Sequence, residues 1–431
     1  MHANLNTRSG PALIEKRAPR KLKFSPLRSI LPGIITGAAN DDPCAVGTYA
    51  QAGATFGFAF LWTAPLTFPM MAATVYLCSK LSLLTGKGIA GIIRDFYPRW
   101  LLYTLISCVF VANIIEAGAD IGAIAAALRL FLPVPVTGIT VAIAIFILLI
   151  QAWGSYQLLH KIFAGLALAL FAYVGAAFLA RPNAGEFIRA TVVPHVHFTR
   201  EYFAMLVALI GTRLSPYVYF WESSQKVEQH AILRRDRDSG RALRSSAWDA
   251  NAGMFFSNLI MYFVILCTAA TLFHPGHRTI TDAAEAADAL RPLAGPLASV
   301  FFALGILGAG ALAVPVLTTG PAHAIAEIFG WSHGLKKSPQ VALEFYAVIA
   351  LSTGVAIGLG ISGINVMSAL YWASLVMGVL AAPLMIVLML AVSNSRIIGQ
   401  HSNGKWLKML GWATTGAVTV AAVALLWTWI V

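Results

Sequence analysis

The chain has 431 residues, of which 58% are hydrophobic and 11% are charged. A soluble protein carries about 25% charged residues, so this composition excludes a soluble enzyme or binding protein and indicates an all-α polytopic membrane protein. The formal net charge is +12, but the basic residues stand in short runs between apolar stretches, which is typical of loops beside a membrane and not of a nucleic-acid-binding surface.

The chain begins with a polar, basic stretch over residues 1–28, which lacks the apolar run of a signal peptide and is expected to be a cytoplasmic tail. A helix needs about 20 apolar residues to cross a bilayer. Stretches of that kind predict eleven transmembrane helices, at 31–56, 58–84, 100–130, 136–153, 157–180, 201–229, 247–272, 293–328, 341–360, 363–392 and 407–430. Most Lys and Arg residues fall in the tail and in every second loop after it, so the positive-inside rule places the N-terminus in the cytoplasm and the C-terminus outside the cell membrane.

The first predicted helix is interrupted by polar residues. Asn40, Asp41 and Asp42 stand directly before Pro43 in the middle of the span, where an ionised carboxylate is costly and the proline removes a backbone donor. Non-helical backbone at this depth occurs only where it is buried in protein or lines a wet cavity. The pattern predicts a broken helix with an ion-binding site, and a short loop between two half-length segments is the alternative.

The third predicted helix carries three polar residues. Asn113, Glu116 and Asp120 are spaced i, i+3 and i+7, so they share one helix face. Carboxyl groups in a row inside a membrane are typical of a proton or ion relay. A solvated structural face is the alternative.

The sixth predicted helix repeats the interruption of the first. Pro216 follows Ser215 in mid-span, with Gly211 upstream. The two breaks fall in the first helix of each group of five, and these helices enter the membrane from opposite sides. Interrupted helices at matching positions of two halves predict a 5+5 inverted repeat of the LeuT type, with repeats at about 29–180 and 201–392. A proline kink without function is the alternative for the sixth helix taken alone.

Charged residues of the sixth helix need partners. Arg213 beside the break would repel a cation unless it pairs with a carboxylate, and Asp41 or Asp42 is the expected partner. We interpret this as a structural salt bridge, and the alternative is a gate, or a side-chain cation that occupies the site between cycles. Glu222 and Lys226 are i, i+4 partners, which favours an interfacial ion pair over an ion exit path.

Motifs at the breaks and in the tenth helix resemble those of the NRAMP family of divalent metal ion transporters, in a divergent bacterial branch. They are Asp41-Asp42-Pro43, Ser215-Pro216-Tyr217, Gly363-Ile364-Asn365 and Ala369-Leu370-Tyr371-Trp372. The resemblance covers helices 1 to 10, which makes residues 29–392 a transporter core and 393–431 a linker with an eleventh helix. It implies a secondary transporter that moves divalent metal cations by alternating access.

In the family, the metal is held by an Asp and an Asn of helix 1, a Met sulfur of helix 6 and a helix-6 backbone carbonyl. The matching positions here are Asp42, Ala45, Ser215 and Thr212, and Tyr217 stands where the family has His. Only one of the three side-chain ligands is therefore unchanged. The family also uses an acidic pair on helix 3 for protons.

The loss of the thioether changes the expected ion. A thioether favours transition metals, whereas carboxylate, hydroxyl and water oxygens suit Mg²⁺ and Mn²⁺. We expect Mn²⁺ or Mg²⁺ as the transported ion, with part of its hydration shell, held by Asp42 with Asp41 or Asn40 nearby. On helix 3, Glu116 matches the second member of the family's acidic pair and Asn113 replaces the first, so proton coupling stays open.

Other functions remain as alternatives. An amino-acid or other small organic solute transporter of the same fold is one, and a passive divalent cation channel is another. No HExxH, GxSxG or Gly-rich phosphate motif is present, so we do not expect an enzyme. The expected partners are membrane lipid, the transported divalent ion and protons, with no other cofactor and no nucleic acid, and the expected state is a monomer.

Overall fold

The computed structural model describes residues 37–153, 165, 168–233, 239–273, 280, 283–291, 295–335, 337–399 and 403–430. Within these ranges the chain is helical, without a strand. The α-helices are α2 (Pro43–Phe56), α3 (Thr63–Thr85), α4 (Ile89–Phe96), α5 (Arg99–Arg129), α6 (Val136–Trp153), α8 (Ala172–Leu179), α9 (Ala184–Val192), α10 (Arg200–Arg213), α11 (Pro216–Leu233), α12 (Ser239–Thr271), α13 (Ala283–Asp288), α15 (Ala298–Phe329), α16 (Leu343–Gly360), α17 (Val366–Ser393), α18 (Ser395–Ile398) and α19 (Lys405–Ile430). Short 3-10 turns are η1 (Gly57–Phe60), η2 (Leu168–Phe171) and η3 (Gly295–Leu297).

Among the described residues, nine helical stretches are long and apolar enough to cross a membrane, with α10 and α11 counted as one. They correspond to nine of the eleven helices that the sequence predicts. The other two predicted helices, 31–56 and 157–180, lie partly outside the described residues, as does all of the tail over 1–28. The expected loop over 230–246 is wrong in extent, because α11 continues to Leu233 and α12 begins at Ser239.

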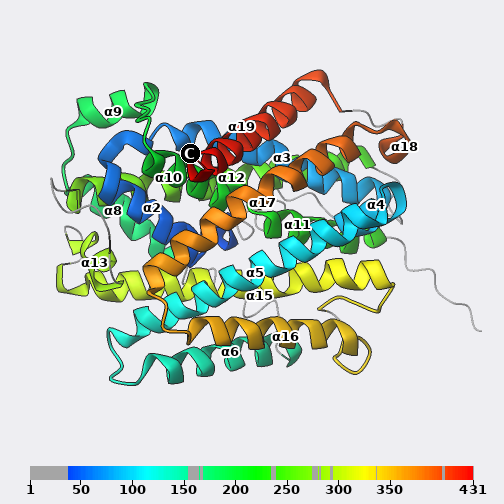
Figure 1. The fold of residues 1–431 in the computed structure, drawn as a ribbon, viewed down its shortest axis with the longest axis horizontal. Coiled ribbons are helices and arrows are strands. Elements are labelled where there is room, and N and C mark those ends of the chain that lie inside the picture. Colours follow the sequence, from blue (N-terminus) through cyan, green and yellow to red (C-terminus); the bar gives the residue numbers. More distant parts are fainter. Residues whose placement is uncertain are drawn as a thin grey trace, which may run out of the picture.

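The long helices pack on both sides of the two helix breaks, of which one precedes α2 and the other separates α10 from α11. Figure 1 shows α5 and α15 side by side across the molecule, with α6 and α16 packed on one side of them. On the other side, α12 packs against α2 and α3, and α11 packs against α3 and α15. Helix α17 contacts α2, α5 and α10, and α19 lies along α17. The first break therefore lies in the interior, between α5 on one side and α12 on the other.

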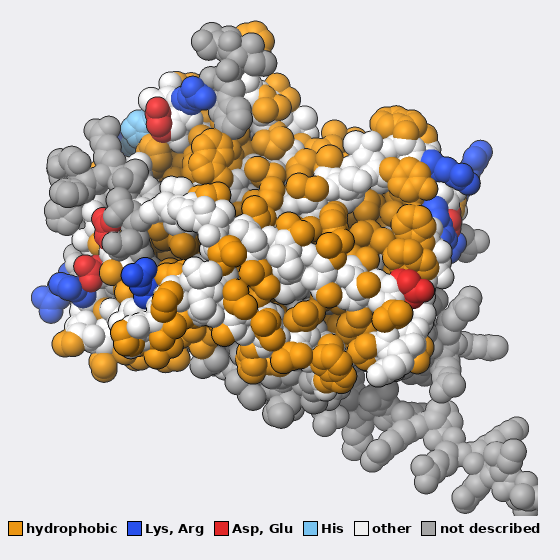
Figure 2. Space-filling model, turned by 60° about the horizontal axis from the view of Figure 1, so that its bottom comes forward, with side chains coloured by type: hydrophobic (Ala, Val, Ile, Leu, Met, Phe, Trp, Pro, Cys, Tyr) orange, Lys and Arg blue, Asp and Glu red, His pale blue; other side chains and the backbone are white. Residues whose placement is uncertain are grey.

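The surface has the distribution of side chains that a membrane requires. In Figure 2, hydrophobic side chains cover the middle of the visible face, and the charged side chains gather toward its two ends. Exposed tryptophans stand at helix ends, with Trp100 near the start of α5 and Trp153 at the end of α6. Tryptophan at helix ends is typical of the two membrane–water interfaces. Lipid is therefore the natural neighbour of this face.

Small residues bring α10 close to α17 just before the second break. A Cβ atom on Gly211 would lie 2.2 Å from the Ser374 carbonyl oxygen and 2.5 Å from the Gly378 backbone nitrogen. Contacts that short cannot be accommodated, so the two backbones touch because both helices have glycine there. This contact holds the last turn of α10 against α17.

Candidate functional site at the two helix breaks

The first break is built by the local chemistry of three residues. Asp42 caps α2, because its Oδ1 accepts the Ala45 backbone N–H at 2.6 Å, and Pro43 is the first residue of the helix. A carboxylate cap and a proline at the first position are both favoured at a helix start. The Tyr217 hydroxyl lies 2.8 Å from the other carboxylate oxygen, Oδ2. Asp42, which is 1% exposed, is thus held from two sides, and Ala45 supplies a backbone donor to it.

The second break lies between α10 and α11, and Ser215 closes it. The Ser215 Oγ lies 2.8 Å from the Gly211 carbonyl oxygen and 3.1 Å from the Thr212 carbonyl oxygen. The last carbonyls of a helix lack intrahelical partners, and the Ser215 hydroxyl lies within hydrogen-bond distance of two of them. The Thr212 carbonyl, which the sequence predicts as a metal ligand, therefore already accepts a hydrogen bond.

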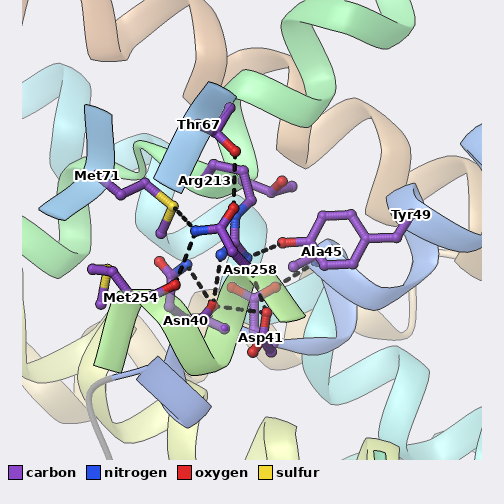
Figure 3. A network of polar contacts seen from close by, with 12 residues as sticks. Asn40, Asp41, Ala45, Tyr49, Thr67, Met71, Arg213, Met254 and Asn258 are labelled. Atoms are coloured by element: carbon purple, nitrogen blue, oxygen red, sulfur yellow. Dashed lines mark hydrogen bonds and ion pairs between the residues drawn. The ribbon is translucent and has the colours of Figure 1, made fainter. Parts of the chain in front are cut away.

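Arg213 and Asp41 form an ion pair that joins the two breaks (Figure 3). The Arg213 Nη1 lies 2.9 Å from Asp41 Oδ1, and both side chains are 0% exposed. The Ser257 hydroxyl donates to Asp41 Oδ1 at 2.9 Å and accepts from Arg213 Nη2 at 2.8 Å. The Tyr49 hydroxyl accepts from Arg213 Nη1 at 2.5 Å. The structure thus gives Arg213 a carboxylate partner, and of the two aspartates expected from the sequence that partner is Asp41.

A second polar group lies beside this pair on the side of α3 and α12. The Asn40 side-chain nitrogen lies 3.4 Å from the Ser257 hydroxyl. Next to it, Asn258 accepts from the Thr67 hydroxyl at 2.9 Å and donates to the Met254 carbonyl oxygen at 2.9 Å. Figure 3 shows Asn258 between Thr67 and Met71, with Asn40 and Asp41 below it. On this side of the break, Asn40 Oδ1, Asp41 Oδ2 and Arg213 Nε have no hydrogen-bond partner among the described residues.

The polar face of α5 meets the first break from the opposite side. Asn113, Glu116 and Asp120 are each 0% exposed. Asp120 Oδ1 accepts the Cys44 backbone N–H at 3.0 Å, and the Cys44 thiol lies 3.9 Å from the Glu116 carbonyl oxygen. Five polar atoms of this face have no hydrogen-bond partner among the described residues, namely Asn113 Oδ1 and Nδ2, both carboxylate oxygens of Glu116, and Asp120 Oδ2.

Asp42 and Asp120 come close enough to share a ligand. One carboxylate oxygen of each and the Cys44 Sγ all lie within 4.8 Å of one another. The sequence predicts the helix-1 aspartate and the α5 face separately, as metal site and as relay, and the structure brings them together. Two carboxylates at this spacing can hold a divalent cation or share protons.

Glu222 is not part of this cluster and forms an ion pair of its own. Its Oε1 accepts from the Ser79 hydroxyl at 2.6 Å and lies 3.3 Å from Lys226 Nζ, which also lies 2.9 Å from Asp249 Oδ2. The expected pair with Lys226 is therefore present, and it is buried among α3, α11 and α12. Its second partner, Asp249, comes from a different helix, which the i, i+4 spacing alone does not indicate.

Sequence reasoning missed Tyr49, Ser257 and Asn258. Ser257 and Asn258 are adjacent polar residues in the apolar stretch 247–272, and that is the signal that could have found them. Tyr49 carries no such signal, because a tyrosine in an apolar helix is ordinary. Its role follows only from the position of Arg213.

Comparisons with known proteins agree with this architecture. The model of a family described as natural resistance-associated macrophage protein-like (Nramp) matches residues 33–428. A divalent metal cation transporter, MntH, of Klebsiella pneumoniae is 26% identical over 410 residues, which cover 93% of this chain and 94% of that protein.

Two solved structures share the fold at lower identity. A crystal structure of a manganese transporter from Eremococcus coleocola, bound to an aromatic bis-isothiourea compound, superposes with a TM-score of 0.73 at 17% identity, covering 94% of this chain and 87% of that one. The inward-facing conformation of Mhp1 superposes with a TM-score of 0.51 at 12% identity, covering 92% and 90%. These likenesses confirm the predicted LeuT-type fold with broken first and sixth helices.

Proposed function

The chain belongs to the Nramp family, whose model covers residues 33–428, and from this membership we propose that it is a secondary transporter of divalent metal cations. The observation that carries the proposal is Asp42, a buried carboxylate held by Ala45 and Tyr217 at a helix break. An unpaired carboxylate at membrane depth is costly, and a passing cation offsets that cost. The names of the bacterial MntH relative and of the manganese transporter from Eremococcus coleocola support the same substrate class.

The ligand chemistry favours a hard ion. Ser215 stands where the family has a methionine sulfur, so the oxygens of Asp42, of backbone carbonyls and of water remain as donors. Such donors suit Mn²⁺ and Mg²⁺ better than soft ions such as Cd²⁺. Mg²⁺ keeps several waters when it binds, which fits a site with few side-chain ligands. We propose transport of Mn²⁺ or Mg²⁺ by alternating access, with no resident cofactor.

The proposal also covers the orientation in the membrane, the coupling to protons and the oligomeric state. The excess of Lys and Arg in alternate loops supports an N-terminus in the cytoplasm and a C-terminus outside the cell membrane. The buried carboxyl groups Glu116 and Asp120 support coupling to protons, because intramembrane carboxyls in a row are typical of proton relays. The protein is proposed to act as a monomer.

Ion flux into proteoliposomes tests this function. We expect saturable uptake of Mn²⁺ or Mg²⁺, faster than uptake of Cd²⁺, with each hard ion competing against the other. A pH-sensitive dye inside the vesicles reports proton movement in the same experiment. Faster uptake of Cd²⁺ would contradict the hard-ion site, non-saturable flux would indicate a channel, and uptake of an organic solute without divalent cation flux would replace the proposal.

A further inference from the structure

We propose that the transported divalent cation binds between the first break and α5, coordinated by the carboxylates of Asp42 and Asp120 with Glu116 as the third carboxylate. This inference rests on the proposed function and adds where the ion binds and which helix completes the site. The position expected from the family's ligands lies instead between the two breaks.

The spacing of the two aspartates fits one ion. One carboxylate oxygen of Asp42 and one of Asp120 lie within 4.8 Å of each other and of the Cys44 Sγ. A divalent cation that binds oxygen at about 2.0–2.6 Å can bridge two oxygens up to about 5 Å apart. A single ion can therefore contact both carboxylates without a movement of the backbone.

Unpartnered oxygens on α5 point to a missing ligand. Asp120 Oδ2 and both carboxylate oxygens of Glu116 are buried and have no hydrogen-bond partner among the described residues. Glu116 lies one helical turn before Asp120, so the two share a face, and its backbone carbonyl contacts the Cys44 thiol at 3.9 Å. Buried polar atoms are almost always satisfied by protein, water or an ion, so these three oxygens are free to be ligands.

The charges are also unbalanced on this side of the break. Arg213 is the basic group beside the break, and it is bound to Asp41, Ser257 and Tyr49. Asp42, Glu116 and Asp120 form no ion pair within the described ranges. Each of these carboxyls needs a proton or a cation at this depth, and one divalent cation supplies two positive charges where the carboxylates of Asp42 and Asp120 approach each other.

Neighbouring groups hold the carboxylates in place. The backbone N–H groups of Ala45 and Cys44 bind Asp42 and Asp120 at 2.6 and 3.0 Å. Hydrogen bonds of this kind orient metal ligands without taking both lone pairs of the oxygen. On the opposite side, the carbonyls of the second break are bonded by Ser215 at 2.8 and 3.1 Å. The α5 side therefore combines two oriented carboxylates with unpartnered carboxylate oxygens, whereas the two carbonyls of the second break each already accept a hydrogen bond.

Mn²⁺ binding to the purified full-length protein, measured by calorimetry, tests the site. Asp120→Asn keeps an oxygen that can accept the Cys44 N–H but removes the charge, so a merely structural Asp120 would leave the affinity unchanged. We expect this variant and Glu116→Gln each to weaken Mn²⁺ binding by at least about 10-fold. The control is Glu327→Gln, which changes a buried carboxyl that binds the N–H groups of Gly88 and Gly91, and it should bind like the wild type.

The outcomes separate this inference from the function itself. Wild-type affinity in both Asp120→Asn and Glu116→Gln, with Asp42→Asn impaired, would place the ion between the breaks and overturn the inference alone. A wild-type protein that binds neither Mn²⁺ nor Mg²⁺ would overturn the proposed function and the site together. The thermal unfolding of each variant without metal, compared with that of the wild type, shows that a lost affinity is not a lost fold.

Discussion

Asp42→Asn is expected to reduce Mn²⁺ or Mg²⁺ uptake by more than about 100-fold, since loss of a direct ligand exceeds the 10- to 100-fold cost of losing an outer-shell partner. Asparagine has the same shape and caps helices as well as aspartate does. The bond from the Ala45 N–H, 2.6 Å long in the wild type, can therefore form in the variant. What the substitution removes is the negative charge that a cation needs at this depth.

The matched control is the same chemical change at a site outside the membrane helices. Asp288 lies in α13, its side chain is 45% exposed, and it pairs with Arg291 at 2.9 Å. Exposed pairs of this kind contribute little, so Asp288→Asn should transport at the wild-type rate. Uptake by Asp42→Asn at the rate of this control would show that the carboxylate is only a helix cap.

Arg213→Met is expected to destabilise the protein by about 3–5 kcal/mol, because it leaves Asp41 buried without its counter-charge. The pair is 2.9 Å apart and both side chains are 0% exposed. The double variant Asp41→Asn/Arg213→Met removes both charges and should recover most of that loss, since a buried pair replaced as a whole is often neutral or stabilising. Thermal unfolding of the four proteins in detergent measures the coupling.

Arg291→Met serves as the control for loss of an arginine, because its partner is Asp288 and its side chain is 71% exposed. We expect no measurable change there. If Arg213→Met and Asp41→Asn/Arg213→Met were equally unstable, the packing of the guanidinium, and not its charge, would be what stabilises the protein. The same cycle, read by transport, separates a structural pair from a gate, because a gate would alter the uptake rate at unchanged stability.

Both helix breaks could be predicted from the sequence because their causes are local. Asp42 caps the start of α2 and Pro43 is its first residue, whereas the Ser215 hydroxyl bonds a carbonyl oxygen at the end of α10 and Pro216 is the first residue of α11. Polar residues in an apolar span are easy to see against their background. The face shared by Glu116 and Asp120 was predictable for the same reason, from spacing on one helix.

Apart from the pairing of Arg213 with an aspartate of the first break, the partners of these residues could not be predicted, because they are set by packing between distant helices. The spacing on α5 defines a face but not what it meets, and only the folded chain places Asp120 beside Cys44, 76 residues away. Arg213 pairs with Asp41 across 172 residues, as the order of the helices suggests, but its bond to Ser257, 44 residues away, has no signal in the sequence. Ser215 was assigned as a ligand by position, whereas its hydroxyl satisfies the carbonyls of its own helix end.

The most direct test of the central claim is the position of a bound Mn²⁺ ion, from anomalous X-ray diffraction of crystals grown with the metal. The account predicts a single strong peak within about 2.6 Å of a carboxylate oxygen of Asp42, on the side of α5 and Asp120. A peak that lies away from Asp42, with the first break unoccupied, would contradict it.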